Sequence, residues 1–406
     1  TTMSAWLSII GIGEDGLAGI TPAARRLIDD AEVLVGGERH LAMAGDHPAE
    51  RLTWRVPLTD TVADIAAQRG RRVCVLATGD PQSYGIGVTL GRSFDRSEMT
   101  IIPHLSAFSL ASARLGWALQ DVQCLTLHGR PLDLINLYVA PEQRLLILSE
   151  NATTPGQVAE RLTELGYGSS QMTVLSNMGG DREQVVQAET AADWADPPVS
   201  DLNTIAVECH AGPDARLMSR VPGLPDELFV SDGQMTKREV RAMTLAALSP
   251  TPGALLWDVG AGSGSVGIEW MRAADRARAI AIEPKPERRA RIAGNAAALG
   301  VPLLRIVEGT APAALDGLPA PDAVFIGGGI TSTGVISACW EALKPGGRLV
   351  ANVVTLEGEQ TIGRYHGTLG GELVRMNVAR AEPVGPYQGW RPLMGVTQWR
   401  LDKSRR

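Results

Sequence analysis

Short apolar segments alternate with helix-like segments along most of the chain. In the second half, candidate strands lie at 254–259, 279–282, 303–307, 322–326 and 347–353. Strands that alternate with helices in this way are typical of a mostly parallel sheet with helices on both faces. The pattern therefore predicts an α/β fold for this half.

The first half shows the same alternation, but its candidate strands fall into two groups. The first group lies at 6–10, 31–35, 72–77 and 99–102, and the second at 144–149, 171–175 and 204–208. Thr21-Pro22 predicts a helix start, because threonine is a common N-cap and proline is tolerated at the first helical position. The grouping predicts two lobes, joined through residues 127–131.

A segment rich in proline, glycine and aspartate, residues 211–227, separates the two halves. Such composition marks loops and linkers. A chain of 406 residues has the length of about two to three domains. We therefore place one domain at 1–212 and a second at 225–406.

Composition and charge exclude several classes of function. The formal net charge is −7, with no basic tract beyond residues 403–406, which argues against nucleic acid as a partner. No apolar run approaches the roughly 18 residues of a membrane span, and residues 1–12 lack the features of a signal peptide. The four cysteines lie far apart without metal-binding spacing. We expect a cytoplasmic protein with no metal site and no membrane partner.

A glycine-rich turn follows the first strand of the second domain. Residues 260–264 read Gly-Ala-Gly-Ser-Gly, and the next strand ends in Glu283. Glycines let the backbone approach a ligand closely, and an acid at this position can accept hydrogen bonds from ribose hydroxyls. The layout predicts a nucleotide-type site beyond the carboxyl ends of the strands. Because Glu283 is expected at a loop tip, we expect it to contribute little to stability.

The glycine turn alone fits two cofactors. Residues 262–267 also satisfy Gly-x-Gly-x-x-Gly, the dinucleotide pattern. Asp258, two residues before the first glycine, is typical of S-adenosylmethionine (SAM) methyltransferases, where nicotinamide folds have an apolar residue. Residues 343–350 look like the turn and strand that follow the fifth helix of those methyltransferases. SAM is therefore the expected cofactor, with an NAD-dependent reductase or a turn without a ligand as weaker alternatives.

Motifs along the whole chain carry a more specific resemblance. The first half resembles tetrapyrrole methylases, with a strand entering Gly11-x-Gly13, a helix opened by Thr21, the turn at 79–81 and the pair at 106–107. The second half resembles precorrin-8-type decarboxylating methyltransferases, in residues 229–241, the glycine turn and residues 352–357. In this order the halves resemble the precorrin-6Y C(5,15)-methyltransferase (decarboxylating) family of cobalamin biosynthesis. In one departure, Glu14-Asp15 follows Gly13, where many tetrapyrrole methylases have proline.

The resemblance implies a two-lobed tetrapyrrole methylase fold, followed by a Rossmann-like class I SAM methyltransferase with a mostly parallel sheet. It also implies two SAM sites per chain. The residues expected at the second-domain site are Thr236, Gly260, Ala261, Gly262, Ser263, Gly264, Glu283, Thr310 and Ala311. Those expected at the first-domain site are Gly11, Gly13, Asp80, Ser106 and Ala107. For Thr236 a capping box with Glu239 is an alternative role, and for Asp80 a turn-forming role.

Basic residues are candidates for substrate binding, because a precorrin carries many acetate and propionate groups. Lys237 and Arg241 lie four apart on one expected helix, and guanidinium and ammonium groups bind carboxylates well. A solvated helix face is the alternative. His128 and Arg130 could also face the tetrapyrrole. No catalytic side chain is identified, since positioning of an activated methyl group can supply most of the acceleration.

The resulting functional hypothesis is a bifunctional SAM-dependent methyltransferase. It would methylate two bridge carbons of precorrin-6Y and remove the carboxyl of a ring acetate to give precorrin-8. The resemblance assigns carbon 5 to the first domain, and carbon 15 with the decarboxylation to the second. A SAM-dependent methyltransferase of another small molecule and a non-catalytic tetrapyrrole carrier are the alternatives. We also expect a homo-oligomer.

Overall fold

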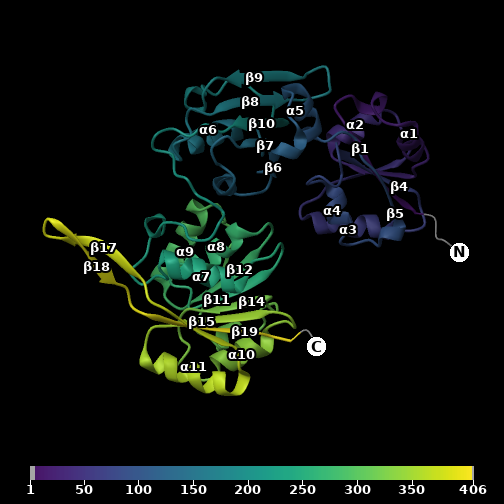
Figure 1. Ribbon diagram of the computed structural model, residues 1–406. Coiled ribbons are helices and arrows are strands. Elements are labelled where there is room, and N and C mark those ends of the chain that lie inside the picture. Colours follow the sequence, from purple (N-terminus) through teal and green to yellow (C-terminus); the bar gives the residue numbers. More distant parts are fainter. Residues whose placement is uncertain (1–4, 405–406) are drawn as a thin grey trace. The chain divides into compact units, whose positions relative to one another are not determined.

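The computed structural model describes residues 5–404, which form two compact units (Figure 1). Unit 1 comprises Thr1–Leu132 and Val139–Arg216, and unit 2 comprises Asp133–Tyr138 and Leu217–Arg406. The first four residues of the segment examined for a signal peptide, and the last two of the basic tail, lie outside the described residues.

Unit 1 begins with a parallel five-stranded sheet in the order β3-β2-β4-β1-β5. Its strands are β1 (Leu7–Ile12), β2 (Val33–Gly36), β3 (Glu50–Thr53), β4 (Val73–Thr78) and β5 (Met99–Ile102). Its helices are α1 (Pro22–Asp29), α2 (Glu38–Met43), α3 (Leu58–Ala67) and α4 (Ile86–Leu90). The Thr21 hydroxyl accepts the Ala24 N–H at 3.2 Å, so the predicted N-cap is confirmed.

The second lobe of unit 1 is a mixed sheet in the order β6-β7-β10-β8-β9. Only β6 and β7 run parallel, and the other pairs are antiparallel. Its strands are β6 (Val122–Thr126), β7 (Arg144–Leu148), β8 (Gln171–Ser176), β9 (Gln184–Ala188) and β10 (Asn203–Glu208), and its helices are α5 (Ala107–Leu115) and α6 (Thr154–Glu164). The two lobes predicted for this half are confirmed, but the predicted junction at residues 127–131 is wrong, because β6 already belongs to the second sheet and the chain passes between the sheets after β5 and before β6.

Unit 2 is built on a seven-stranded sheet in the order β13-β12-β11-β14-β15-β19-β16. The first five strands are parallel, while β19 and β16 are antiparallel to their neighbours. The strands are β11 (Leu255–Val259), β12 (Arg278–Glu283), β13 (Arg305–Glu308), β14 (Ala323–Ile326), β15 (Arg348–Val353), β16 (Glu372–Met376) and β19 (Val396–Asp402). The mostly parallel sheet predicted from the alternation is confirmed.

Helices cover both faces of this sheet, because side chains of each strand alternate between two cores. Leu256 faces a core completed by α7 (Arg238–Leu248), α8 (Ser265–Ala273) and α9 (Pro286–Ala298). Trp257 faces the opposite core with α10 (Val335–Ala342) and α11 (Leu356–Leu369). β11 lies between β12 on one side and β14 on the other, so the strand order reverses beside β11. Ligands bind at such a reversal of strand order, beyond the carboxyl ends of the strands.

Along the chain, β16 and β19 are separated by a two-stranded ribbon that extends from unit 2 (Figure 1). Its strands are β17 (Ala379–Val384) and β18 (Tyr387–Pro392). Most of its side chains are exposed on both faces. Within residues 5–404, no helix is long and apolar enough to cross a bilayer. In the same range, no group of three or more His, Cys, Asp or Glu residues is arranged to hold a metal ion.

Candidate active sites

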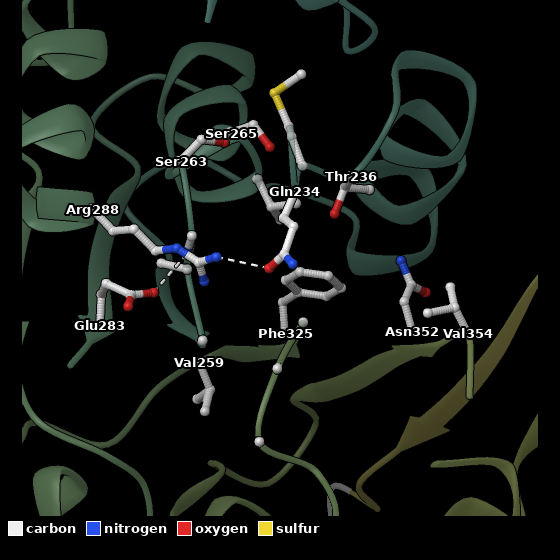
Figure 2. A pocket seen from close by; sticks show the side chains of 18 of the residues that line it. Gln234, Thr236, Val259, Ser263, Ser265, Glu283, Arg288, Phe325, Asn352 and Val354 are labelled. Atoms are coloured by element: carbon white, nitrogen blue, oxygen red, sulfur yellow. Dashed lines mark hydrogen bonds between the residues drawn. The ribbon is translucent and has the colours of Figure 1, made fainter. Parts of the chain in front are cut away.

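A cavity of about 910 Å³ opens at the carboxyl ends of β11, β12, β14 and β15 (Figure 2). All the unit 2 residues expected to hold SAM except Gly264 line it, from Thr236 to Ala311. Glu283 lies at one end of the cavity, and Asn352 and Val354 lie at the other. This size is within the range of small-molecule sites and leaves space beyond a single nucleotide-sized ligand.

The glycine turn owes its sequence to backbone geometry. Gly260, Gly262 and Gly264 have φ of +70°, +60° and +77°, a region that favours glycine. A Cβ at Gly260 would lie 2.7 Å from the Gly328 backbone, and one at Gly264 would lie 2.9 Å from Ile292. At Gly262 the nearest atom would be 3.7 Å away, so its missing side chain leaves the cavity floor open. The turn therefore adopts a backbone conformation that favours glycine and gives a ligand close access to the backbone.

Glu283 is not an exposed residue at a loop tip. It is 2% exposed, and its two carboxylate oxygens accept the Gly262 N–H at 3.0 Å and the Lys285 N–H at 3.1 Å. The expected position of Glu283 at a loop tip is wrong, and because this carboxylate ties the glycine turn to the end of β12, we now expect it to contribute to stability. Each oxygen keeps a lone pair for a ligand hydroxyl.

Asp258 lies beneath the turn and does not reach the cavity surface. Its Oδ2 accepts the Gly267 N–H at 2.9 Å, while its Oδ1 has no hydrogen-bond partner. Burial, and secondarily the charge of Glu283, raises the pKa of Asp258 to about 7. The acid is therefore half-protonated near neutral pH, when an exposed aspartate would be fully ionised.

The raised pKa of Asp258 predicts a pH-dependent stability. Between about pH 4 and pH 7 the folded state holds a proton that the unfolded state has lost, so stability falls as pH rises and levels off above the folded pKa. Asp258→Asn keeps an acceptor for Gly267 but cannot ionise. The free energy of unfolding, measured by denaturant titration from pH 4 to pH 8, should decline less in this variant, by a difference of the order of 2–4 kcal/mol. Parallel profiles for variant and wild type would contradict this account.

The segment before α7 covers one side of the cavity and is fastened to α9. Arg288 Nε donates to Asp232 at 2.8 Å, its NH2 group donates to Gln234 Oε1 at 2.7 Å, and Arg291 pairs with Asp232 at 3.3 Å. The Arg288–Gln234 bond is visible beside Glu283 in Figure 2. These ion pairs hold the backbone of Gln234 near Gly262.

Thr236 and Lys237 both line the cavity, and neither side chain makes the hydrogen bond of a capping box at the start of α7. The N-cap of α7 is Lys237, and its side chain makes no capping bond. Thr236 instead uses its carbonyl to accept a hydrogen bond from Arg241 at 2.7 Å. The alternative of a capping box with Glu239 is therefore wrong. In the described part of the chain no carboxylate pairs with Lys237, which leaves this ammonium group available to a ligand.

Arg241 is buried with its donors used inside unit 2, and it does not lie on a solvated helix face either. Its side chain is 0% exposed and pairs with Glu269 at 2.8 Å and Asp226 at 3.1 Å. It also donates to the carbonyl oxygens of Thr236 and Leu224. The prediction for Arg241 is wrong because these internal acceptors use its donors.

In unit 1 the residues around the first glycine turn meet as the sequence motifs suggest. A Cβ at Gly11 would lie 1.9 Å from the Gly79 oxygen and 2.5 Å from the His104 nitrogen. A Cβ at Gly13 would lie 2.7 Å from Asp15 Oδ1 and 2.9 Å from the His104 ring. The ends of β1, β4 and β5 therefore converge; backbone atoms exclude any side chain at Gly11, whereas at Gly13 the close atoms belong to the Asp15 and His104 side chains.

The polar residues of this turn also have local structural roles. Asp80 Oδ1 accepts the Gln82 N–H at 2.8 Å, which is the turn-forming alternative considered for it. Its other oxygen makes no hydrogen bond within the described residues. Ser106 is the N-cap of α5, accepting the Ser109 N–H at 3.1 Å, and Ala107 is the first residue of that helix.

The acidic pair after Gly13 is compensated by basic partners. Glu14, with a side chain only 9% exposed, forms ion pairs with Arg39 and with Arg182, the latter at 3.6 Å. Asp15 lies 3.3 Å from His104. The departure from the usual proline thus places little uncompensated negative charge beside the turn.

His128 and Arg130 lie on the surface of the second lobe. The His128 ring is 3.4 Å from Glu150 and largely exposed. Arg130 stacks on Tyr84 at 5.5 Å and lines a depression of about 400 Å³. Their predicted contact with a tetrapyrrole remains a prediction.

Comparison with known proteins matches two parts of the chain to two families. The family described as tetrapyrrole (corrin/porphyrin) methylases matches residues 7–193, and the family described as precorrin methyltransferase domain matches residues 227–403. A Sinorhizobium precorrin-6Y C(5,15)-methyltransferase (decarboxylating) is 50% identical over 403 residues, covering 99% of this chain and 97% of that protein. The chain belongs to this methyltransferase family.

Relatives of about half the length each match a part of this chain. A Salmonella typhimurium cobalt-precorrin-7 C(5)-methyltransferase is 32% identical over 50% of this chain and 98% of its own length. A Pyrobaculum calidifontis protein, named probable cobalt-precorrin-6B C(15)-methyltransferase (decarboxylating), is 38% identical over 41% of this chain and 88% of its own length.

Several residues of the methyltransferase cavity were not identified from the sequence. They are Gln234, Ser265, Arg288, Phe325, Ser332, Asn352 and Val354. Asn352 and Val354 belong to the segment 352–357 that carried the family resemblance, but that pattern assigned them no role. Arg288 has no local signal, since its partners Asp232 and Gln234 lie more than 50 residues earlier.

Proposed function

We propose that this protein methylates two bridge carbons of precorrin-6Y and removes the carboxyl group of a ring acetate, giving precorrin-8. The observation that carries the proposal is the match to a precorrin-6Y C(5,15)-methyltransferase at 50% identity along 99% of the chain. The cavity of unit 2 supports it, because its glycine turn and Glu283 are arranged for a nucleoside ligand. A methyltransferase of another small molecule and a non-catalytic carrier are the competing functions.

The residues of the cavity fit SAM. The open backbone at Gly262 and the free lone pairs of Glu283 suit the ribose, while Thr310 and Ala311 would flank the adenine. When bound, SAM supplies an electrophilic methyl group beside a positively charged sulfur. The protein's contribution is then to hold the two reactants in line and exclude water, which can supply about 7–11 kcal/mol of the barrier reduction.

We further propose two SAM sites per chain with divided tasks. Unit 1 would methylate carbon 5, using the turn formed by Gly11, Gly13, Asp80, Ser106 and Ala107. Unit 2 would methylate carbon 15 and decarboxylate. Separate relatives named for the C(5) and C(15) reactions, each matching about half of the chain, support this division.

Asp80→Ala in the full-length protein should prevent carbon 5 methylation and leave decarboxylation intact. The second carboxylate oxygen of Asp80 would contact the SAM molecule bound in unit 1. The SAM molecule bound in unit 2, where decarboxylation would occur, would not be affected. Mass spectrometry of the product should show one methyl group fewer, with the rate of that methylation reduced by at least about 10-fold. Calorimetry with SAM should fall from two equivalents toward one.

Asp80→Asn is the matched control, because asparagine keeps an acceptor for the Gln82 N–H and so preserves the turn. If Asp80→Asn is fully active, the residue has only a structural role. If wild-type protein saturates at one equivalent of SAM, the proposal of two sites fails.

We propose that the protein is a homo-oligomer assembled through the ribbon β17–β18. Trp390 is 78% exposed, Tyr387 75% and Val384 64%, on a two-stranded ribbon of a kind that is marginally stable alone in water. Both of its edges are free to pair, and a second copy offers the same edge in a symmetric, self-complementary contact.

Light scattering should therefore report a mass above the 43.1 kDa of one chain. Replacing Trp390 and Tyr387 by serine should shift the protein toward the monomer, because it removes most of the exposed apolar surface of the ribbon. Leu303→Ser, at another exposed apolar position of unit 2, is the control. A wild-type monomer would contradict the proposal.

We also propose a cytoplasmic location. All four cysteines are free, and three of them are buried. Reduced cysteines of this kind are typical of proteins in a reducing compartment.

A further inference from the structure

A buried hydrogen-bond network fixes the orientation of Asn352 at the end of β15. Arg400 Nε, which can only donate, donates to Gln398 Oε1 at 2.6 Å. The Gln398 amide nitrogen must therefore face inward, where it donates to Asn352 Oδ1 at 2.8 Å and to Thr244 Oγ1 at 3.1 Å. Gln398 and Thr244 are both 0% exposed.

The hydroxyl of Thr244 shows which end of the Asn352 amide faces it. It donates to the Val240 carbonyl at 2.8 Å, so it acts as an acceptor toward Asn352 Nδ2 at 2.9 Å. One N–H of the Asn352 amide therefore remains unused within the described residues. Asn352 lines the cavity, at the end opposite Glu283 in Figure 2. The network thus holds a neutral donor at the end of the cavity opposite Glu283, the residue expected to bind the ribose of SAM.

The surroundings of Asn352 are mostly apolar. Val354, Met394 and Val396 line the cavity with it. Arg288 lies beside Glu283, at the other end, and is paired with Asp232. Lys237 also lines the cavity, and no carboxylate within residues 5–404 pairs with it.

We propose that Asn352 binds the ring acetate whose carboxyl group is lost, which rests on the function proposed above. In that step the bond between the acetate methylene and the carboxyl carbon breaks, and carbon dioxide leaves. Its electron pair stays on the methylene carbon, delocalised into the macrocycle, until a solvent proton converts the methylene to a methyl group. No oxidant or reductant is required.

A neutral donor suits this step better than a cation does. Negative charge leaves the carboxylate as the bond breaks, so a cation would stabilise the reactant more than the transition state. The Asn352 N–H can instead hold the carboxylate in one orientation, in which the breaking bond between the methylene and carboxyl carbons is directed across the macrocycle. The cation Lys237 would suit a carboxylate that the product keeps.

Three variants of the full-length protein test this assignment with precorrin-6Y labelled in the acetate carboxyl groups. Asn352→Ala should slow single-turnover release of carbon dioxide, measured below saturation, by about 10- to 150-fold, because binding of the reacting carboxylate loses one hydrogen bond to a charged group. Asn352→Lys should bind precorrin-6Y more tightly in the absence of SAM and still release carbon dioxide more slowly. Thr368→Ala, an exposed neutral polar position of α11 that does not line the cavity, should change neither quantity.

The outcomes separate this inference from the proposed function. If wild-type protein releases no carbon dioxide, the function itself is wrong. If wild type is active and Asn352→Ala or Asn352→Lys releases carbon dioxide at the wild-type rate, Asn352 does not hold the reacting acetate. A lower melting temperature with unchanged single-turnover release would assign the network a purely structural role.

Discussion

Glu283→Ala is expected to weaken SAM binding in unit 2 by about 10- to 150-fold, because the variant loses charge-assisted hydrogen bonds to the ribose hydroxyls. The same substitution should lower the free energy of unfolding by about 1–3 kcal/mol. That second effect follows from the structure, in which the buried carboxylate accepts the N–H groups of Gly262 and Lys285. Calorimetry with SAM and thermal melting without ligand measure the two effects separately.

Two further variants complete this test. Glu283→Gln keeps one acceptor oxygen and should be milder in both measurements. Glu308→Ala is the matched control, because Glu308 pairs with Glu283 in register at the end of the adjacent strand and its side chain is 76% exposed. Unaltered SAM affinity per folded molecule of Glu283→Ala would show that this carboxylate only holds the turn.

Arg241→Met should produce the largest loss of stability in unit 2. It leaves Glu269, which is 2% exposed, without its cationic partner, and breaking a buried ion pair in this way costs about 3–5 kcal/mol. For a unit of this size that corresponds to a fall in melting temperature of about 6–20 °C. Differential scanning calorimetry measures the change.

Lys237→Ala is the contrasting variant at the start of the same helix. Its melting temperature should stay close to that of wild type, while its affinity for precorrin-6Y should fall. Adding Glu269→Leu to Arg241→Met should recover part of the lost stability, because it removes the uncompensated charge. A stable Arg241→Met protein that no longer binds precorrin-6Y would instead restore Arg241 as a substrate ligand.

Strands with strong apolar patterns could be predicted from the sequence, and exposed ones could not. The buried strands β1, β4 and β11 stand out because neighbouring elements cover both of their faces. The strands β3 and β9 are mostly exposed and carry polar residues, so their sequences resemble loops. The ribbon β17–β18 contains proline and glycine, which obscure any alternation.

In the candidate site, too, some residues could be predicted from the sequence and others could not. The glycine turn and Glu283 form a local pattern set by one strand-turn-helix unit, so the sequence reveals them. Arg241 looked like a surface residue beside Lys237, because its burial depends on Glu269, 28 residues away. The orientation of Asn352 depends on Gln398, 46 residues away in a neighbouring antiparallel strand. Contacts of that kind arise from tertiary packing and leave no local signature.

Mass spectrometry of precorrin-6Y before and after incubation with the full-length protein and SAM tests the two methylations and the decarboxylation together. The product should have gained two methyl groups and lost one carbon dioxide. Precorrin-6Y recovered unchanged, or methyl transfer with all of its carboxyl groups retained, would contradict the proposed function.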